Sequence, residues 1–366
     1  MTALRILIAG AGIAGLAAKH ALARRGIDAD VVERDAVPRI TGAGLYLPGN
    51  AVRALRDLGL GEQLGERSHP IHRQQLEDER GRVLAELPVS AIWGETGDCV
   101  AMRRADLHSL LLEAVGETQV RFGVAVREVD RDGTVTFGDG QQSRYDLVIG
   151  ADGIHSAVRL YAFPEAEPRF LGQVTWRFLA PSAGLPEHTW TVMLGDRGRT
   201  FLIVPVGDGQ VYCSAAMDSA SPGGQPDDWR AVFDDFATGG LLDYAGEAHF
   251  APLYEVNAFD RTHPRAVLIG DAAHACSPSM SQATAMAAED AIVLAETLAE
   301  ARGRETVPAL LAAYRERRAD RLRFVLAQNR RRDQARHMPA FVRRVVFRHF
   351  AEGIFRSNHK RLLARP

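Results

Sequence analysis

Three glycines near the start of the chain have a spacing that can hold phosphate groups. Gly10, Gly12 and Gly15 form the pattern G-x-G-x-x-G between a short apolar run and a helix-like segment. At this spacing Gly10 permits a tight turn, Gly12 lets a pyrophosphate approach the backbone, and Gly15 lets the helix pack closely on the strand. The helix would start at Ile13 and Ala14, where free N–H groups and the helix dipole favour anions. The segment therefore predicts a phosphate-binding turn, although the pattern alone is weak evidence.

A carboxylate at the end of the next predicted strand strengthens this interpretation. The apolar run 4–9 predicts a buried parallel strand, and residues 29–32 predict a second strand that ends in Glu33. Glu33 follows Gly10 by 23 positions, where a carboxylate can accept hydrogen bonds from an adenosine ribose. A secretory signal is the alternative for residues 1–23, but the three glycines interrupt its apolar run. Together these features predict a dinucleotide site.

Two further apolar runs lead to aspartates. Residues 145–150 predict a buried strand before Asp152, and a similar run precedes Asp271. An aspartate at the carboxyl end of a central parallel strand points into the crevice where doubly wound sheets bind ligands. After Asp271, Pro278 precedes a predicted helix over 283–298, whose N-terminus favours a negatively charged or electron-rich group.

Composition restricts the class of protein. The chain has 366 residues, 46% of them hydrophobic and 25% charged, with a net charge of −2. This length suits about two globular domains, and the charge gives no reason to expect nucleic acid. Cys99, Cys213 and Cys276 are widely spaced, so we expect no disulfide framework, no metal site and a cytoplasmic location. No apolar run approaches the ~20 residues of a membrane-spanning helix.

The strand and helix patterns predict two domains in an α/β protein. Residues 1–70, 97–160 and 261–366 alternate strands and helices and end in C-terminal helices. Residues 71–96 contain a hairpin, and 161–260 contain short β-type runs separated by Gly and Asp turns. We expect both insertions to share one antiparallel sheet that forms a substrate domain, since a lone hairpin is only marginally stable in water.

Taken in order, the three motifs resemble those of the single-component FAD-dependent aromatic hydroxylases, the p-hydroxybenzoate hydroxylase family. The likeness spans nearly the whole chain and is weakest over 161–260 and after about residue 330. It implies a Rossmann-like FAD-binding domain of the GR2 type, with an inserted antiparallel β-sheet substrate domain and C-terminal helices.

The resemblance also implies cofactor-binding roles. The three glycines and Glu33 would hold the FAD pyrophosphate and adenosine ribose, and Arg104 would contact the cofactor from the side. Asp152 would lie where the cofactor and the incoming NAD(P)H meet, and Asp271 would bind the ribityl hydroxyls. The implied cofactor-binding residues are Gly10, Gly12, Ile13, Ala14, Gly15, Glu33, Arg34, Arg39, Arg104, Asp152, Asp271, Ser281, Ala283 and Thr284.

The turn after Pro278 would face the isoalloxazine ring, and here the sequence departs from the family. The family usually has a turn of the type Gly-Gln-Gly, whereas this chain has Ser281-Gln282-Ala283-Thr284. The added Cβ atoms could restrict approach to the ring or its movement, which affects the reaction outcome or the pocket shape more than FAD binding. Arg39, in a glycine-containing loop, is either a solvated charge or a residue near the ring or its reductant.

Substrate contacts are expected on the β-sheet domain. Apolar and aromatic residues on strands more often belong to a core, so this assignment stays open between core and pocket. The candidates are Trp176, Met193, Phe201, Tyr212 and, on the turn, Pro278. His274, beside Asp271, is expected to be a hydrogen-bonded structural residue, and we assign no catalytic side chain.

These features predict a FAD-dependent monooxygenase in which the cofactor carries the chemistry. The resemblance implies that NADPH or NADH reduces FAD and that dioxygen forms a flavin hydroperoxide. That species would hydroxylate or epoxidise an aromatic or polyketide-like small molecule. The Gly-Trp-x-Trp-x-Ile-Pro stretch of a halogenase is absent. Two alternatives stay open: a FAD-dependent reductase or rearranging enzyme without oxygen insertion, and a non-catalytic FAD-binding accessory protein.

The C-terminal segment from 314 to 348 is rich in arginine, with apolar residues interleaved. A basic amphipathic helix of this kind could lie on an anionic membrane or bind a partner. We expect instead that it packs on the FAD-binding domain with its arginines in solvent. Any contact surface would lie beyond Asp333.

Overall fold

The first strand lies at the centre of a parallel sheet, as its unbroken apolar sequence predicts. The computed structural model describes residues 4–38, 43–182 and 184–366. All four residues of β1 (Ile6–Ala9) are buried, as expected for a parallel sheet covered on both faces. The five parallel strands run in the order β18 (Ala266–Leu268), β12 (Leu147–Gly150), β1, β2 (Asp30–Glu33) and β8 (Val120–Phe122).

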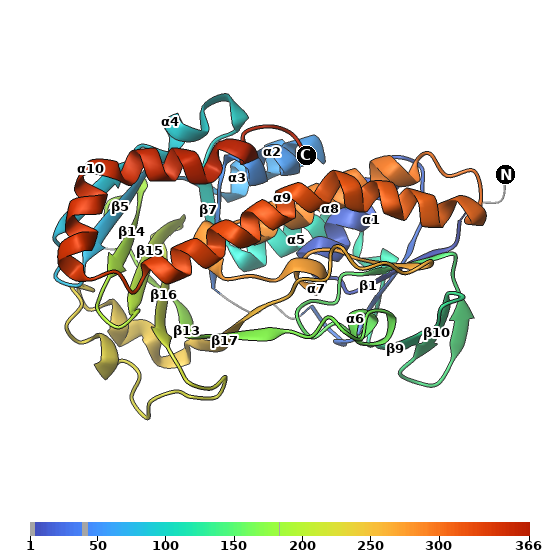
Figure 1. The fold of residues 1–366 in the computed structure, drawn as a ribbon, viewed down its shortest axis with the longest axis horizontal. Coiled ribbons are helices and arrows are strands. Elements are labelled where there is room, and N and C mark those ends of the chain that lie inside the picture. Colours follow the sequence, from blue (N-terminus) through green and yellow to red (C-terminus); the bar gives the residue numbers. More distant parts are fainter. Residues whose placement is uncertain (1–3, 39–42, 183) are drawn as a thin grey trace.

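Helices cover this sheet and lead into the rest of the molecule (Figure 1). Among them, α1 packs against both α5 and α8, and α8 packs against α9. The α-helices are α1 (Ile13–Ala23), α2 (Gly49–Asp57), α3 (Gly61–Arg67), α4 (Val89–Trp93), α5 (Arg104–Val115), α6 (Ala157–Ala162), α7 (Asp271–His274), α8 (Ala283–Leu298), α9 (Val307–Ala335) and α10 (Ala340–His359). In Figure 1, α9 crosses from the parallel sheet toward a second, larger sheet.

The larger sheet has seven strands. Their order is β17 (His249–Glu255), β13 (Arg169–Pro181), β16 (Gln210–Asp218), β15 (Thr200–Gly207), β14 (Thr189–Leu194), β5 (Arg73–Asp78) and β6 (Val83–Leu87). The hairpin β5–β6 therefore shares a sheet with the strands of 161–260, as predicted. The sheet is not wholly antiparallel, because β14 and β5 pair in parallel. These two strands come from distant parts of the chain, so no tight turn sets their relative direction.

Two small antiparallel sheets complete the strands. One runs in the order β3 (Gly44–Leu47), β7 (Val100–Arg103) and β4 (His69–Pro70), and the other in the order β11 (Gln142–Arg144), β10 (Thr134–Phe137) and β9 (Val126–Val129). β3 contacts the seven-stranded sheet at β15 and β16. Gly44 lies so close to Tyr212 that an added Cβ would be 2.5 Å from the Tyr212 side chain, and Tyr46 stacks on Trp190 with ring centroids 4.5 Å apart. β3 thus joins the two halves of the molecule.

The seven-stranded sheet buries a different set of residues on each face. The face toward β3 carries Tyr212, Val204 and Trp190, which belong to the same core as β1. The opposite face packs against segment 229–245 and forms a second core, in which the Trp176 and Trp229 rings stack at 4.9 Å. Alternation along each strand therefore separates an inner from an outer face.

A buried charge network joins α8 to α9. Asp290, which is fully buried, accepts hydrogen bonds from the Gly270 backbone N–H (3.0 Å), His274 Nε2 (2.6 Å) and Arg318 Nε (2.8 Å). Burial alone would raise the pKa of Asp290, but the charges of His274 and Arg318 and these hydrogen bonds lower it from 3.8 to about 2. His274 is thus a structural residue, as the sequence predicts.

The neighbouring carboxylate extends the network to the C-terminus. Glu289 pairs with Arg318 (2.9 Å) and Arg321 (2.6 Å). Arg321 also donates to the backbone carbonyls of Arg361, Leu362 and Ala364. The network therefore ties the last residues of the chain to the helix that follows the Gly270-Asp271 turn.

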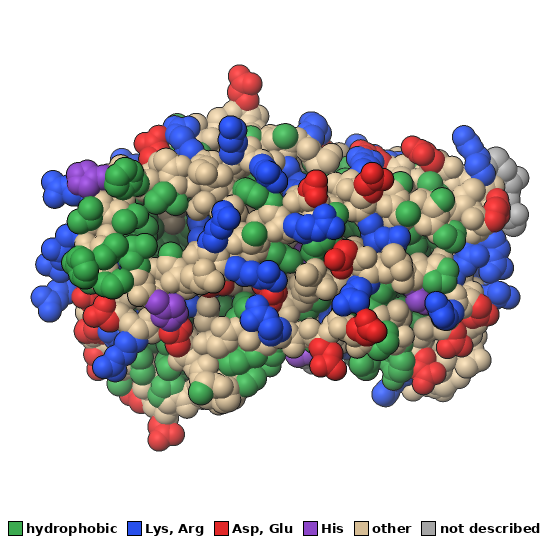
Figure 2. All heavy atoms as spheres, viewed as in Figure 1, with side chains coloured by type: hydrophobic (Ala, Val, Ile, Leu, Met, Phe, Trp, Pro, Cys, Tyr) green, Lys and Arg blue, Asp and Glu red, His purple; other side chains and the backbone are tan. Residues whose placement is uncertain are grey.

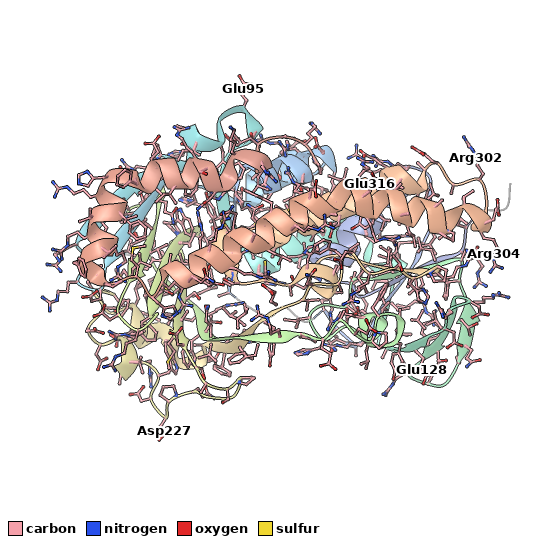
Figure 3. The ribbon with its side chains drawn as sticks, in the orientation of Figure 1. Glu95, Glu128, Asp227, Arg302, Arg304 and Glu316 are labelled. Atoms are coloured by element: carbon pink, nitrogen blue, oxygen red, sulfur yellow. The ribbon has the colours of Figure 1, made fainter. Side chains whose placement is uncertain are left out.

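The expectation that the C-terminal arginines stay in solvent is wrong for Arg318, Arg321 and Arg343. Arg318 and Arg321 meet the two carboxylates of α8, and Arg343 donates to the carbonyls of Leu194 and Gly195. Burial is tolerated because each charge has partners there. The opposite side of α9 remains polar, and Glu316 points outward in Figure 3.

The expected helix 50–58 is present as α2, but Asn50 does not cap it. Asn50 is fully buried inside the helix, and its amide donates to Gln282 Oε1 at 2.8 Å and accepts from Gln282 Nε2 at 3.2 Å. Pro48 occupies the capping position instead. Among the helices of the described residues, none is long and apolar enough to cross a membrane.

Replacing Asp290 by Asn should destabilise the protein strongly. The substitution removes one of the two carboxylates that pair with the buried guanidinium of Arg318 and leaves the other, Glu289, shared between Arg318 and Arg321. Breaking a buried pair costs about 3–5 kcal/mol in the free energy of unfolding. Denaturant titration measures this loss. The difference from the native protein should shrink as the pH falls from 3.8 to about 2, because a carboxylate with a lowered pKa loses its stabilisation over this interval.

Asp98→Asn is the matched control. Asp98 pairs with Arg56 at 2.6 Å on the surface, with their side chains 72% and 50% exposed. Such pairs contribute about 0–1 kcal/mol. Equal losses in the two variants would contradict the structural role of the buried network.

Candidate cofactor and substrate site

The glycine turn between β1 and α1 has a separate physical reason for each glycine. Gly10 has a φ of +104°, and a Cβ there would lie 2.5 Å from the carbonyl oxygen of Ala151. A Cβ on Gly15 would collide with the Gly10 carbonyl oxygen. A Cβ on Gly12 would meet no atom of the described part of the chain within 4 Å. Gly10 and Gly15 are therefore required by the protein's own packing, whereas Gly12 leaves open space over the turn.

That open space belongs to a cavity of about 540 Å³ at the carboxyl ends of the parallel strands. Of the residues predicted to bind the cofactor, those lining it are Gly10, Gly12, Ile13, Glu33, Arg34, Arg104 and Asp152. The cavity is lined by residues from five separate segments of the sequence, at the edge where open α/β sheets bind ligands.

Glu33 braces the glycine turn from the end of β2. Its Oε2 accepts from the Ala11 backbone N–H (2.8 Å), and its Oε1 accepts from the Asp35 backbone N–H (3.0 Å). A carboxylate has about four acceptor positions, so Glu33 can still accept bonds from a ligand in the cavity.

Asp152 caps α6. Its carboxylate accepts from the backbone N–H groups of Ala157 (2.7 Å) and Val158 (3.2 Å) and from the Ser156 hydroxyl. Desolvation raises the pKa of Asp152, and the bonds that it accepts oppose this shift. The Asp152 side chain lines the same cavity as the glycine turn. Most of its hydrogen-bonding capacity is used by Ser156, Ala157 and Val158 at the start of α6.

Charged groups from both halves of the molecule meet beside Arg104. Burial lowers the pKa of Arg104, the nearby charge of Asp271 opposes this shift, and Arg177 adds to it. Desolvation, followed by the charges of Arg177 and Arg104, lowers the pKa of His249. Asp271 itself is exposed at the start of α7. The region between the two sheets therefore combines one carboxylate with several cationic groups.

The turn before α8 is held by α9. The Met280 N–H donates to Asn329 Oδ1 (3.0 Å), Arg332 donates to the Ser279 carbonyl oxygen (2.7 Å), and the Ser279 hydroxyl donates to Asp333 (2.7 Å). Ser281 has a φ of +51°, a left-handed conformation that glycine adopts more easily. The chain thus forms a glycine-like turn without glycine, with Ala283 exposed at the helix start and Thr284 buried.

Three of the predicted substrate residues do not reach the site. Trp176, Met193 and Phe201 lie on the outer face of the seven-stranded sheet, in the core that packs against segment 229–245. The register explains this, since Phe201 is opposite Met193 and both Phe201 and Trp176 are opposite Ala215, which places all three side chains on one face. Tyr212 is on the inner face beside Gly44, and Pro278 is exposed.

Other predicted residues take supporting positions. Gly15 packs under the turn, and Ala14 lies against Gly270, where an added Cβ would be 2.6 Å from the Ala14 Cβ. Arg39 lies outside the described residues.

Sequence reasoning missed several residues that line the cavity. His108 was not among the predicted site residues. It lines the cavity, and its Nε2 lies 2.8 Å from the Ala11 carbonyl oxygen of the glycine turn. It follows Arg104 by four positions in α5, so helical spacing alone could have indicated it. Val124, Arg127 and Tyr161 also line the cavity but carry no sequence signal of their own.

The residues present fit a dinucleotide cofactor. The space over Gly12 is a cradle that a Cβ would fill, and the free N–H groups at the start of α1 favour an anion there. Within the ranges 4–38, 43–182 and 184–366, no group of three or more His, Cys, Asp or Glu side chains could hold a metal ion. All three cysteines are free thiols.

Comparisons with known proteins agree with this geometry. The model of the FAD binding domain family matches residues 3–329. The aurachin C monooxygenase/isomerase of Stigmatella aurantiaca is 33% identical over 335 residues, which cover 87% of this chain and 86% of that protein. The FAD-dependent urate hydroxylase of Klebsiella pneumoniae is 30% identical, covering 91% of each chain. The crystal structure of Klebsiella pneumoniae HpxO complexed with FAD and uric acid has a TM-score of 0.87 at 28% identity and covers 99% of this chain and 97% of that one.

Fold, site and relatives together define a FAD-binding flavoprotein. The chain belongs to the family of single-component FAD-dependent aromatic hydroxylases, and it is a flavoprotein monooxygenase.

Gly12→Val should weaken FAD binding without unfolding the protein. The valine side chain would occupy the open space over the turn, where the cofactor pyrophosphate would lie. A steric cost of about 1–3 kcal/mol, typical of overpacking, corresponds to roughly 5- to 150-fold weaker FAD binding. Fluorescence titration of the apoprotein with FAD measures the affinity, and thermal melting checks the fold.

Two variants serve as controls. Gly65→Val places the same side chain on α3, where a Cβ also meets nothing within 4 Å, and should bind FAD normally. Gly15→Val should lose the fold itself, because its Cβ collides with backbone. Unchanged FAD affinity in Gly12→Val would refute the assigned cradle.

Proposed function

We propose that this enzyme inserts one oxygen atom into a small planar aromatic molecule bound between the cofactor cavity and the inner face of the seven-stranded sheet. The observation that carries this proposal is the meeting of Arg104, which lines the cofactor cavity, with Arg177 and Tyr212 of the sheet. A substrate held there is in reach of both halves. The relatives support the proposal, since they include a urate hydroxylase and a 3-amino-4-hydroxybenzoate 2-monooxygenase.

The chain's own residues would hold FAD along the cavity. The N–H groups after Gly12 would bind the pyrophosphate, Glu33 would accept from the adenosine ribose, and Asp271, whose charge lies near Arg104, would accept from the ribityl chain. The turn at Ser281 and the start of α8 would lie toward the ring system. When bound, FAD would supply the redox chemistry, which is acceptance of a hydride from NADPH or NADH and activation of dioxygen. The protein orients the partners and excludes water.

The inner face of the sheet supplies polar groups suited to a ring that carries both a donor and an acceptor. Trp190 and Gln74 are paired across β14 and β5 and are 6% and 5% exposed. Trp190 Nε1 and Gln74 Oε1 have no hydrogen-bond partner among the residues that the structure describes. Buried polar groups are normally paired, so an N–H donor and an adjacent acceptor that lack partners favour a ligand with complementary groups, such as a ring lactam or amide.

The charge of the region favours an anionic or acidic substrate. The positive charge of Arg177 lowers the pKa of Arg104, and both arginines lower the pKa of His249. The carboxylate of Asp271 is the opposing charge beside Arg104. A phenolate, enolate or ring carboxylate would offset this excess of positive charge. Such an oxygen also makes an aromatic ring electron-rich, as oxygen insertion requires.

Two broader assignments accompany this proposal. The division into a FAD-binding domain of 1–70, 97–160 and 261–366 and a substrate domain of 71–96 and 161–260 is consistent with the site lying between the two sheets. The three free cysteines suit a reducing compartment and support a cytoplasmic location.

Turnover with labelled dioxygen tests the proposal. Purified protein loaded with FAD should be bleached by NADPH or NADH without oxygen. With isotopically labelled dioxygen and a panel of quinolones, purines and aminohydroxybenzoates, one product should gain a labelled oxygen atom. Bleaching without label in any product would favour the reductase or rearranging enzyme, and no bleaching would favour the accessory protein.

Gln74→Leu should raise the KM of the substrate found in this way. Losing the bond to a buried acceptor costs about 1–3 kcal/mol of binding free energy, which corresponds to a KM roughly 5- to 150-fold higher. Gln75→Leu is the matched control, because Gln75 lies on the other face of the same strand and donates to Glu77 at 2.9 Å. Equal KM values in the two variants would remove Gln74 from the substrate site.

A further inference from the structure

An apolar face is exposed on the last long helix, α10. Phe341 and Val345 are 74% and 56% exposed and lie four positions apart, on one side of the helix; we call these two residues the α10 apolar face. Phe350 and Ile354, which are 61% and 40% exposed, lie on another side of the same helix. Single exposed apolar residues are ordinary, but a group of large ones on one helix indicates an interaction site. Figure 2 shows hydrophobic side chains gathered over α10 at the left end of the molecule, bordered by Lys and Arg.

Basic side chains accompany this face. The exposed Lys and Arg residues between positions 340 and 364 are Arg344, Arg348, Arg356, Lys360 and Arg361. Glu352 is the single acidic residue of that segment, and it already accepts from Arg356 at 2.8 Å. Because the whole chain carries a net charge of −2, this positive charge is local. It favours an anionic partner.

The arginines nearest the apolar residues are available for such a partner. Arg344 and Arg348 follow Phe341 and Val345 by three positions, so each arginine neighbours an apolar side chain on the helix surface. Neither arginine forms an ion pair with any residue in the described part of the chain. Their charges therefore face solvent.

The other side of α10 is anchored, so the exposed face cannot turn inward. Arg343 donates to the carbonyls of Gly195 (3.0 Å) and Leu194 (2.8 Å). Ala351 and Phe355 are 7% and 5% exposed and belong to the main core. The helix is thus fixed to the protein with its apolar and basic residues outward.

We propose that α10 docks the protein on the surface of an anionic lipid bilayer. The α10 apolar face enters the boundary between headgroups and acyl chains, and Arg344 and Arg348 contact the lipid phosphates. Apolar insertion and basic charge together provide the two signals that stable surface binding needs. A second copy of the chain fits this face less well, since pairing it with itself would bring like charges together.

Co-flotation with vesicles tests the proposal on the full-length protein loaded with FAD. The protein should float with vesicles of phosphatidylcholine and phosphatidylglycerol and stay behind with phosphatidylcholine alone. Binding should weaken as salt is raised, because the attraction to anionic lipid is screened. No flotation with either vesicle, or equal flotation with both, would overturn the proposal.

Variants separate the two contributions. Arg344→Gln with Arg348→Gln should lower the partition coefficient by about 30-fold, from the usual effect of each basic side chain near an anionic surface. Phe341→Ser with Val345→Ser should also lose binding while thermal melting stays unchanged, because these side chains are exposed. Tyr244→Ser is the control. Tyr244 is 57% exposed and does not belong to α10, so this variant should bind vesicles like the native protein.

Sedimentation without vesicles distinguishes the competing occupant. If the native protein is a dimer and Phe341→Ser with Val345→Ser is a monomer, a second copy covers the face and the lipid proposal is wrong. Flavin bleaching by NADPH is measured in the same variants. It should be unchanged, so failure of vesicle binding leaves the proposed oxygenase activity untouched.

Discussion

Two adjacent carboxylates in α8, Glu289 and Asp290, impose the constraint on which most of the structure depends. Buried charges are costly unless they are paired, and here every oxygen of Asp290 is engaged by Gly270, His274 or Arg318. Because Gly270 immediately precedes Asp271, this network sets the position of a proposed cofactor ligand. Through Arg321 on Glu289 it also fixes the C-terminal tail. A buried polar cluster behind the Gly270-Asp271 turn therefore orders the site.

The same helix α9 that pairs with these carboxylates holds the turn thought to face the flavin ring. Asn329, Arg332 and Asp333 bind consecutive backbone and side-chain groups of residues 279–280. With so many contacts, Ser281 can occupy a left-handed conformation that costs about 1–2 kcal/mol for a residue with a Cβ. The contacts from α9 therefore hold the turn although it lacks the glycines that are usual in the family.

Arginine serves three different purposes in this protein, and its surroundings decide which. Arg318 is buried and neutralised by two carboxylates. Arg104 and Arg177 lie between the two sheets, where their charges act on a common region. Arg344 and Arg348 stay in solvent beside apolar side chains on α10. Because guanidinium remains charged in all three settings, each one attracts an anion of a different kind.

The sequence by itself determined the parallel-sheet half and the glycine turn, because these depend on local signals: apolar runs, glycine spacing and the carboxylate at Glu33. It also indicated that hairpin 73–87 joins the larger sheet. Only the tertiary structure decided which face of that sheet meets the cavity, and so separated Tyr212 from Trp176. Alternation with period two defines two faces but cannot say which one is covered by a distant segment. For the same reason Arg318 and Arg344 look alike in sequence, since their partners lie far away along the chain.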